Sequence, residues 1–121
     1  DPNIKDTVTT IAEGTKAVQQ LAEVLAKNPD IDVLIEGHTD NVPYSGNGTL
    51  VDNWDLSVKR ATAIVRILKS KGVSPTQLTA AGRSEYIPVS DNTSAAGKAK
   101  NRRIEIILTP NLDEISKLLN D

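Results

Sequence analysis

The sequence predicts an α/β fold: a two-layer sandwich in which helices pack mainly on one face of a small mixed sheet. Three observations predict it. Segments with apolar residues three and four positions apart alternate along the chain with short runs of β-branched residues. Their connections are rich in Pro, Gly, Asn and Asp, which favour turns. The length of 121 residues suits one compact core, so we expect residues 1–121 to form a single domain.

The first two predicted elements are a helix and a strand. Apolar residues at helical spacing indicate an amphipathic helix over residues 13–27: Ala17, Val18, Leu21, Ala22 and Leu25. Asn28 and Pro29 should end this helix, because proline cannot continue one. Residues 33–35 are typical of a strand, and residues 37–40 form its polar exit.

A long loop and a second helix follow. Residues 41–53 show turn chemistry and no periodicity, and a loop of this length in so small a domain often serves function. Asp55 is placed to cap a helix that runs to Lys71. Gly72 stands where a glycine commonly ends a helix.

The last part of the chain predicts two more strands. Residues 78–82 form a short one, and residues 86–97 form a second polar loop. Residues 103–108 alternate between an apolar and a wetter face, and Glu36 should lie on the wetter face too. Residues 111–121 have the spacing of an amphipathic helix, which we expect to dock on that face or on a neighbouring part of a longer protein.

Composition excludes several classes of function. The chain has 14 Lys plus Arg against 16 Asp plus Glu, so it lacks the positive surplus that nucleic acid binding rewards. Its three aromatic residues are scattered, and it has no cysteine for disulfides, thiolate metal sites or thiol catalysis. No apolar run is long enough to span a bilayer. The start at Asp1, without an initiator Met, favours an excised piece of an exported protein over a cytosolic one.

The residue types also argue against catalysis and against a bound cofactor. His38 is the only imidazole, and a single histidine without a cluster of other metal ligands cannot form a zinc site. No nucleophile elbow or phosphate-binding loop is present. We therefore expect His38 to fix the strand exit through hydrogen bonds. A basic run is expected to be solvated: Lys98, Lys100, Arg102 and Arg103.

Arg60 does not fit the pattern of the second helix. It falls in the middle of the apolar sector that is expected to face the sheet: Leu56, Ala63, Ile64, Ile67 and Leu68. A buried guanidinium needs an acceptor, because an unpaired buried charge costs several kcal/mol. The alternative is that the stem of Arg60 follows the apolar sector while its head reaches water.

Asp40 ends the strand before the long loop, and Arg60 begins the helix after it. In a helix packed on a sheet, these two points lie near each other, so both side chains should face one cleft. Two interpretations stay open. The two residues bind each other in a structural salt bridge, or Asp40 binds the ammonium and Arg60 the carboxylate of a zwitterionic ligand.

Three ordered motifs carry a family resemblance: GHTD at residues 37–40, NWDLSVKRA at 53–61 and NRRI at 101–104. Together they resemble the OmpA-like C-terminal peptidoglycan-binding domain of OmpA porins, Pal-type lipoproteins and MotB-type stator proteins. The resemblance extends from about residue 10 to residue 108. It implies a β-α-β-α-β core. In the family a first strand precedes the first helix, and residues 1–10 represent it poorly. They form a truncated strand, with a remnant at residues 7–9, or a linker.

The resemblance also implies a function. Asp40 and Arg60 would contact the amino and carboxylate groups of meso-diaminopimelate in the peptidoglycan stem peptide, while Thr39, Asn53, Leu56 and Arg103 would line or brace the pocket. The domain would catalyse nothing and would use no metal or cofactor. It would lie in the periplasm of a Gram-negative bacterium, attached to the outer membrane or an envelope complex through an upstream region. The alternatives are an envelope protein-interaction domain with an internal Asp–Arg pair and, as a weaker candidate, a wall hydrolase.

Overall fold

The computed structural model of the chain describes residues 7–11, 15–46 and 48–109. These residues form a four-stranded sheet of order β1-β4-β2-β3 and three α-helices. In chain order the elements are β1 (Thr7–Ile11), α1 (Thr15–Ala26), β2 (Asp32–His38), α2 (Asn53–Ser70), β3 (Leu78–Gly82), α3 (Ala95–Asn101) and β4 (Arg103–Thr109). Strands β2 and β3 are parallel, and β4 runs antiparallel to both of its neighbours. The sheet is therefore mixed, as predicted.

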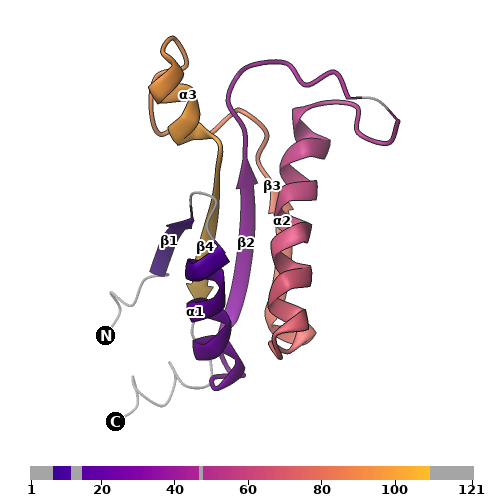
Figure 1. Cartoon of the computed structure of the whole chain (residues 1–121), viewed down its shortest axis with the longest axis vertical. Coiled ribbons are helices and arrows are strands. Elements are labelled where there is room, and N and C mark those ends of the chain that lie inside the picture. Colours follow the sequence, from indigo (N-terminus) through magenta and orange to yellow (C-terminus); the bar gives the residue numbers. More distant parts are fainter. Residues whose placement is uncertain (1–6, 12–14, 47, 110–121) are drawn as a thin grey trace, which may run out of the picture.

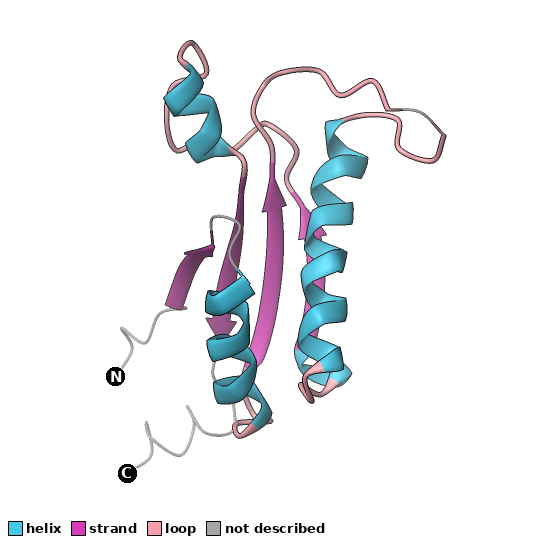
Figure 2. Cartoon of the chain, viewed as in Figure 1, coloured by secondary structure: helices cyan, strands magenta, loops and turns pink. Residues whose placement is uncertain are grey.

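The two long helices cover one face of the sheet, as Figure 1 and Figure 2 show. The core lies between the two layers and takes buried apolar side chains from both: Val18, Ala22, Leu25, Val33, Ile35, Ala61, Leu68, Val73, Ile104 and Ile106. The predicted two-layer architecture is confirmed. None of the described helices is long and apolar enough to cross a membrane.

The strands alternate between the two faces of the sheet as the sequence predicts. In β2 and β4, Ile35 and Ile106 face the helices and are fully buried. Glu36 and Glu105 are direct partners in the register of β2 and β4, so both point to the opposite face. The expectation that Glu36 lies on the wetter face of the sheet is confirmed.

Helix α2 begins earlier than predicted, because its N-cap is Asp52 and not Asp55. The side chain of Asp52 accepts a hydrogen bond from the Asp55 backbone N at 3.0 Å. Asp55 lies in the first turn, and its carboxylate accepts from the Val51 backbone N at 2.9 Å. The helix ends as predicted: Gly72 has a φ of 97°, and its N–H donates to the Lys69 carbonyl at 3.1 Å.

The face of α2 that meets the sheet also differs from the prediction. The residues that are buried are small or polar for most of the helix: Asn53, Ser57, Ala61 and Leu68. Ala63 and Ile67, which were expected to face the core, are exposed. The reason is the close approach at Gly37 and Gly82, where any side chain would overlap Ser57. Small residues therefore mark the contact line, and Arg60 lies on its flank and not at its centre.

The second loop contains a helix that the sequence did not predict. Helix α3 starts within the predicted loop of residues 86–97, with Ser94 as its N-cap accepting from the Gly97 N–H at 3.0 Å. At the other end of the chain, β1 pairs with β4 along five residues, so a short first strand is present. The predicted C-terminal helix at residues 111–121 lies outside the described residues.

Candidate ligand-binding cleft

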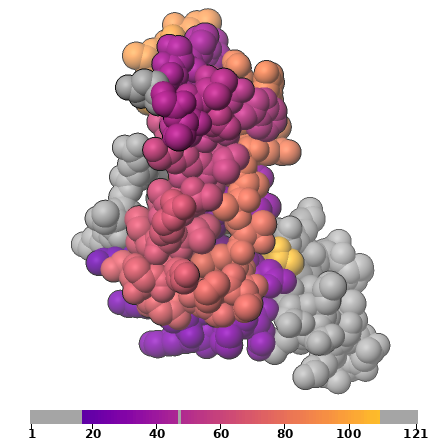
Figure 3. Space-filling view, turned by 90° about the vertical axis from the view of Figure 1, so that its right-hand side faces the viewer, coloured from indigo at the N-terminus to yellow at the C-terminus, as the bar shows by residue number. Residues whose placement is uncertain are grey.

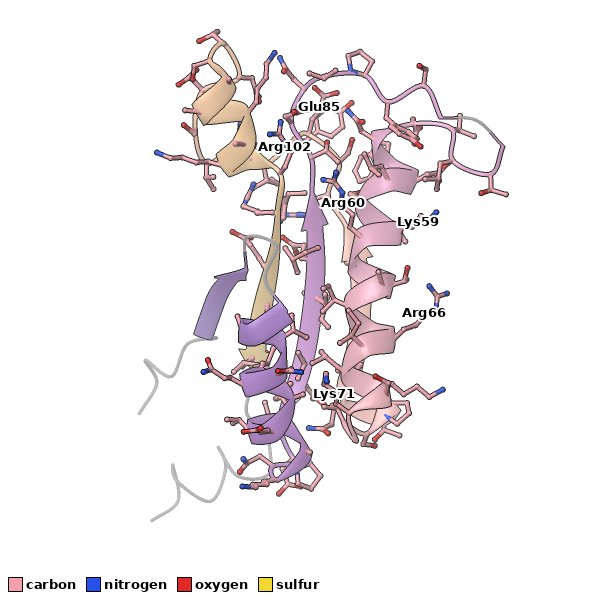
Figure 4. The ribbon with its side chains drawn as sticks, viewed as in Figure 1. Lys59, Arg60, Arg66, Lys71, Glu85 and Arg102 are labelled. Carbon is pink, nitrogen blue, oxygen red and sulfur yellow. The ribbon has the colours of Figure 1, made fainter. Side chains whose placement is uncertain are left out.

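A cavity of about 330 Å³ opens where β2 ends and α2 begins. Nine residues line it: Thr39, Asp40, Val42, Pro43, Tyr44, Asn53, Leu56, Arg60 and Arg102. Figure 4 shows Arg60 reaching from α2 and Arg102 from the end of α3 towards the tip of β2. The cavity is at the lower end of the size range of small-molecule sites. Five of the six predicted binding residues meet here, and Arg103 is the exception.

Asp40 is the only acidic residue among those that line the cavity, and it is held from two sides. Its Oδ1 accepts a hydrogen bond from the Val42 backbone N at 3.0 Å. Its Oδ2 accepts from Arg102 Nη1 at 2.7 Å, a short charge-assisted contact. The Asp40 side chain is 10% exposed and that of Arg102 is 44% exposed. The carboxylate is thus fixed in direction and still reaches the cavity.

Arg60 is half-buried and lines the same cavity. Among the described residues, no acceptor lies within hydrogen-bonding distance of its guanidinium and no carboxylate pairs with it. The direct Asp40–Arg60 salt bridge, one of the two interpretations of the sequence, is not formed, because the acid is paired with Arg102 instead. The cleft therefore presents a guanidinium that has no protein counter-charge among the described residues.

Asn53 builds the wall of the cleft from the loop. It is buried, and its Oδ1 accepts from the Tyr44 backbone N at 3.2 Å while its Nδ2 donates to the Val42 carbonyl at 3.1 Å. These bonds hold residues 42–44 of the loop after β2 against the first turn of α2. In Figure 3 this loop (purple to magenta) gathers at the same end of the molecule as α3 (orange).

Thr39 and Leu56 complete the lining near the two charges. The Thr39 hydroxyl donates to the Asp40 carbonyl at 2.9 Å, and the Thr39 backbone N donates to the Ser84 carbonyl at 2.9 Å. Ser84 has a positive φ of 54°, a conformation that non-glycine residues adopt uncommonly. The backbone of β2 is thus fixed up to the residue that carries the acid. Leu56 adds an apolar surface to the lining.

A family model shows to which protein family the chain belongs. The model described as "OmpA family" matches residues 5–102, most of the chain. The chain belongs to the OmpA family. It is 35% identical over 99 residues to motility protein B of Bacillus subtilis, an alignment that covers 81% of this chain and 38% of that protein.

Two further similarities bear on this OmpA-family domain. It is 31% identical over 103 residues to the peptidoglycan-binding protein ArfA of Mycobacterium tuberculosis, covering 85% of this chain and 30% of that protein. A solved structure described as the cell wall anchor of the T6SS from Pseudomonas aeruginosa is 30% identical with a TM-score of 0.74, covering 92% of this chain and 86% of that one. The chain thus spans well under half the length of these two curated relatives.

Arg103 does not line the cavity, which leaves the second role that the resemblance implied, that of a brace. Its guanidinium is buried on the other face of the sheet, where Nη2 donates to the Ile87 carbonyl at 2.8 Å and Nη1 to the Asn101 carbonyl at 3.1 Å. Side chains alternate along β4, and Arg103 shares the face of Glu105, with Nε 3.3 Å from its Oε1. In this OmpA-family domain Arg103 braces the end of α3, which carries Arg102.

His38 and two glutamates form a compact group on that same face. His38 Nε2 lies 2.8 Å from Glu36 Oε1 and 3.2 Å from Glu105 Oε2, and the contact with Glu36 is a hydrogen bond that holds the end of β2, as expected. Three potential metal-ligand atoms therefore lie within 4.8 Å of one another. The carboxylates, however, also face Arg103 and, at 3.7 Å, Arg83 Nε. We interpret the group as a charge network that joins β2 to β4, and we assign no metal to it.

The expectation of a solvated basic run holds for only part of its residues. Lys100 is exposed, but Arg102 pairs with Asp40 and Arg103 is buried. Asn101 directs the chain here: its fully buried amide accepts from Val89 N at 2.8 Å and donates to the Ser90 carbonyl at 3.0 Å. Sequence reasoning missed Arg102 because its partner lies 62 positions away.

Proposed function

We propose that this chain binds peptidoglycan without catalysis, by holding the free zwitterionic end of meso-diaminopimelate in the stem peptide. Asp40 receives the ammonium group, and Arg60 receives the carboxylate. The domain thereby anchors the outer membrane, or an envelope complex to which it is attached, to the cell wall. In this proposal it works in the periplasm, joined to its membrane through sequence upstream of residue 1.

The observation that carries the proposal is the separation of Asp40 and Arg60. Both line one cavity, and they do not satisfy each other. A carboxylate held by Val42 N and Arg102 still has free lone pairs for a ligand ammonium, because each oxygen can accept more than one hydrogen bond. The Arg60 guanidinium presents a planar fork that matches a carboxylate. A group that carries both charges side by side fits this pair.

The names of similar proteins support the same ligand. The Mycobacterium tuberculosis relative is named for peptidoglycan binding, and the Pseudomonas aeruginosa structure is described as a cell wall anchor. Both align with most of this chain, including the segments that build the cleft. The choice of diaminopimelate within the polymer rests on the charge pair and on the family resemblance.

The expected strength of binding follows from the number of charged contacts. Each charge-assisted hydrogen bond contributes about 1.5 to 3 kcal/mol, and ordering the ligand offsets part of this gain. One stem should therefore bind with a dissociation constant on the order of micromolar to millimolar. The wall presents many identical stems, so rebinding raises the occupancy of an anchored domain.

The experiment that tests the proposal is calorimetric titration of the chain with a muropeptide that contains meso-diaminopimelate. We expect saturable binding that weakens at least tenfold in Asp40→Asn and in Arg60→Gln, because each loses one charged contact. Lys59→Gln is the matched control: it removes a positive charge from the neighbouring residue, which Figure 4 shows pointing away from the cleft. Equal affinity in all four proteins would refute the proposed site.

The rival functions give different results. A pure protein-interaction domain, in which Asp40 and Arg60 would bind each other and not a ligand, would show no heat with the muropeptide. A wall hydrolase would reduce the turbidity of purified wall, whereas we expect co-sedimentation with the wall and constant turbidity. His38, the residue that a hydrolase could use as a base, is outside the cleft lining and is engaged by Glu36.

A further inference from the structure

Arg102 brings a second guanidinium to the cleft. The family resemblance did not assign this residue to the ligand. Arg102 leaves α3 as the residue that follows its last turn, and its side chain lines the same cavity as Arg60. Its side chain is 44% exposed, so it is open to a ligand that enters from solvent. The lining therefore contains one carboxylate and two guanidiniums, a surplus of one positive charge.

The bond to Asp40 leaves most of the N–H donors of Arg102 free of acceptors in the part of the chain that the structure describes. An arginine has five N–H donors, and within the described residues the only acceptor of this guanidinium is Asp40 Oδ2. The remaining donors have no protein acceptor there, while the Asp40 contact holds the guanidinium at the cavity through Nη1. A second carboxylate of the ligand can use these donors without breaking the ion pair.

We infer that Arg102 is a specificity-determining residue that binds a second carboxylate, so that the cleft selects an amino-acid end with two carboxylates and one ammonium. The charges then balance: Asp40 takes the ammonium, Arg60 one carboxylate and Arg102 the other. A ligand with a single carboxylate leaves one guanidinium facing a neutral group in a partly buried site, which weakens binding.

This inference rests on the proposed function and makes its ligand more specific. In a stem peptide, one amino group of diaminopimelate is part of the peptide bond, so one ammonium remains. Both carboxylates are free only when diaminopimelate is the last residue of the stem. An additional residue converts this carboxylate into a peptide bond and moves the negative charge to its own carboxyl terminus. An amide on the carboxyl group removes the negative charge altogether. The cleft should therefore favour tripeptide stems over longer or amidated ones.

The test is a calorimetric comparison of two peptides: L-alanyl-γ-D-glutamyl-meso-diaminopimelate, and the same peptide with a carboxamide on the peptide-bonded centre of diaminopimelate. The zwitterionic centre is identical in both. We expect the acid to bind the unmodified chain about tenfold more tightly than the amide, the value of one charge-assisted contact at a half-exposed group. In Arg102→Gln the two affinities should agree within about twofold.

Lys100→Gln is the matched control, since it removes the same charge from an exposed position of α3 and should keep the preference. Arg102→Lys should keep part of the preference, and thermal melts establish that each variant folds. Equal affinities for acid and amide in the unmodified chain would overturn the inference and leave the proposed function intact. A full preference that survives in Arg102→Gln, or tighter binding of both peptides by that variant, would also overturn it. Failure of both peptides to bind the unmodified chain would instead refute the proposed function.

Discussion

Replacing Gly37 by alanine tests how α2 is seated on the sheet, which decides where Arg60 lies. A Cβ at Gly37 would overlap the Ser57 carbonyl oxygen and lie 2.9 Å from the carbonyl carbon, so backbone must move. Overpacking costs about 1 to 3 kcal/mol, and the lower entropy of the unfolded chain returns about 0.7. We expect a net loss of about 1 to 2 kcal/mol, which lowers the Tm of a domain of this length by about 4 to 8 °C.

Gly82 provides the internal control, because its added Cβ would meet the Ser57 hydroxyl and the Val58 side chain, not only backbone. Ser57→Ala alone should cost about 1 kcal/mol, since its Oγ accepts from Ser84 N at 3.1 Å. In urea unfolding, the cost of Gly82→Ala should be about 0.5 to 1 kcal/mol smaller when Ser57→Ala is also present. The cost of Gly37→Ala should be the same with and without Ser57→Ala. Wild-type stability of Gly37→Ala, or equal relief at both glycines, would refute this account of the packing.

Three further predictions concern ionisable groups other than Asp40 and Arg60. Burial and the charge of Arg103 lower the pKa of His38, against the opposing effect of Glu105 and Glu36. The contribution of His38 to stability should therefore be fully present above about pH 6.5 and decline below it. His38 is the only histidine in the chain, and an NMR titration midpoint above about 6.5 would contradict this prediction. Hydrogen bonds from Thr93 and Ser94 lower the pKa of Asp91 to about 2, so its contribution to stability should be lost between about pH 4 and pH 2, and acid unfolding curves of Asp91→Asn should lack that component; identical pH dependence would contradict it. Arg103→Gln should lower the unfolding free energy by about 3 kcal/mol, because Glu105 and two carbonyls lose a buried partner. The neighbouring variant Arg102→Gln should lower it by about 1 kcal/mol or less, and urea unfolding measures both. Equal losses would show that burial does not decide the energetic importance of the two arginines.

The parts of the fold that local chemistry dictates could be predicted from the sequence. Strand β3 spans the five residues expected, and Gly72 ends α2 through its positive φ. Errors arose where two local signals were equivalent. Asp52 and Asp55 are both good caps, and only the extended backbone of Asp52 in the structure shows which one lies outside the helix.

Helix α3 could not be predicted because tertiary contacts stabilise it. Its seven residues include a glycine and have no amphipathic pattern. Its last residue, Asn101, is fully buried and makes four hydrogen bonds to residues 89–92, which fix the turn of the chain. Isolated helices of this length are unstable in water, so propensity alone gives no signal.

Five of the six residues predicted for the cleft line it, although the predicted position of Arg60 on α2 was wrong. Arg60 was singled out as the centre of a buried apolar sector, yet the contact line of α2 runs through Ser57 and Ala61. Arg60 and Asp40 still line one cavity, because Arg60 flanks that line on the side where the chain leaves β2 towards Asp40. Arg102, which also lines the cavity, lies 62 positions after Asp40, so its charge becomes visible at the cleft only in the folded chain.

The most direct test of the central claim is a crystal structure of the chain with meso-diaminopimelate bound. We expect the ligand in the cavity, with an ammonium about 2.8 Å from an Asp40 carboxylate oxygen and a carboxylate bound by the Arg60 guanidinium. A cavity that stays without ligand at saturating concentration, with Arg60 turned onto Asp40, would contradict the claim that these two charges are kept apart for a guest.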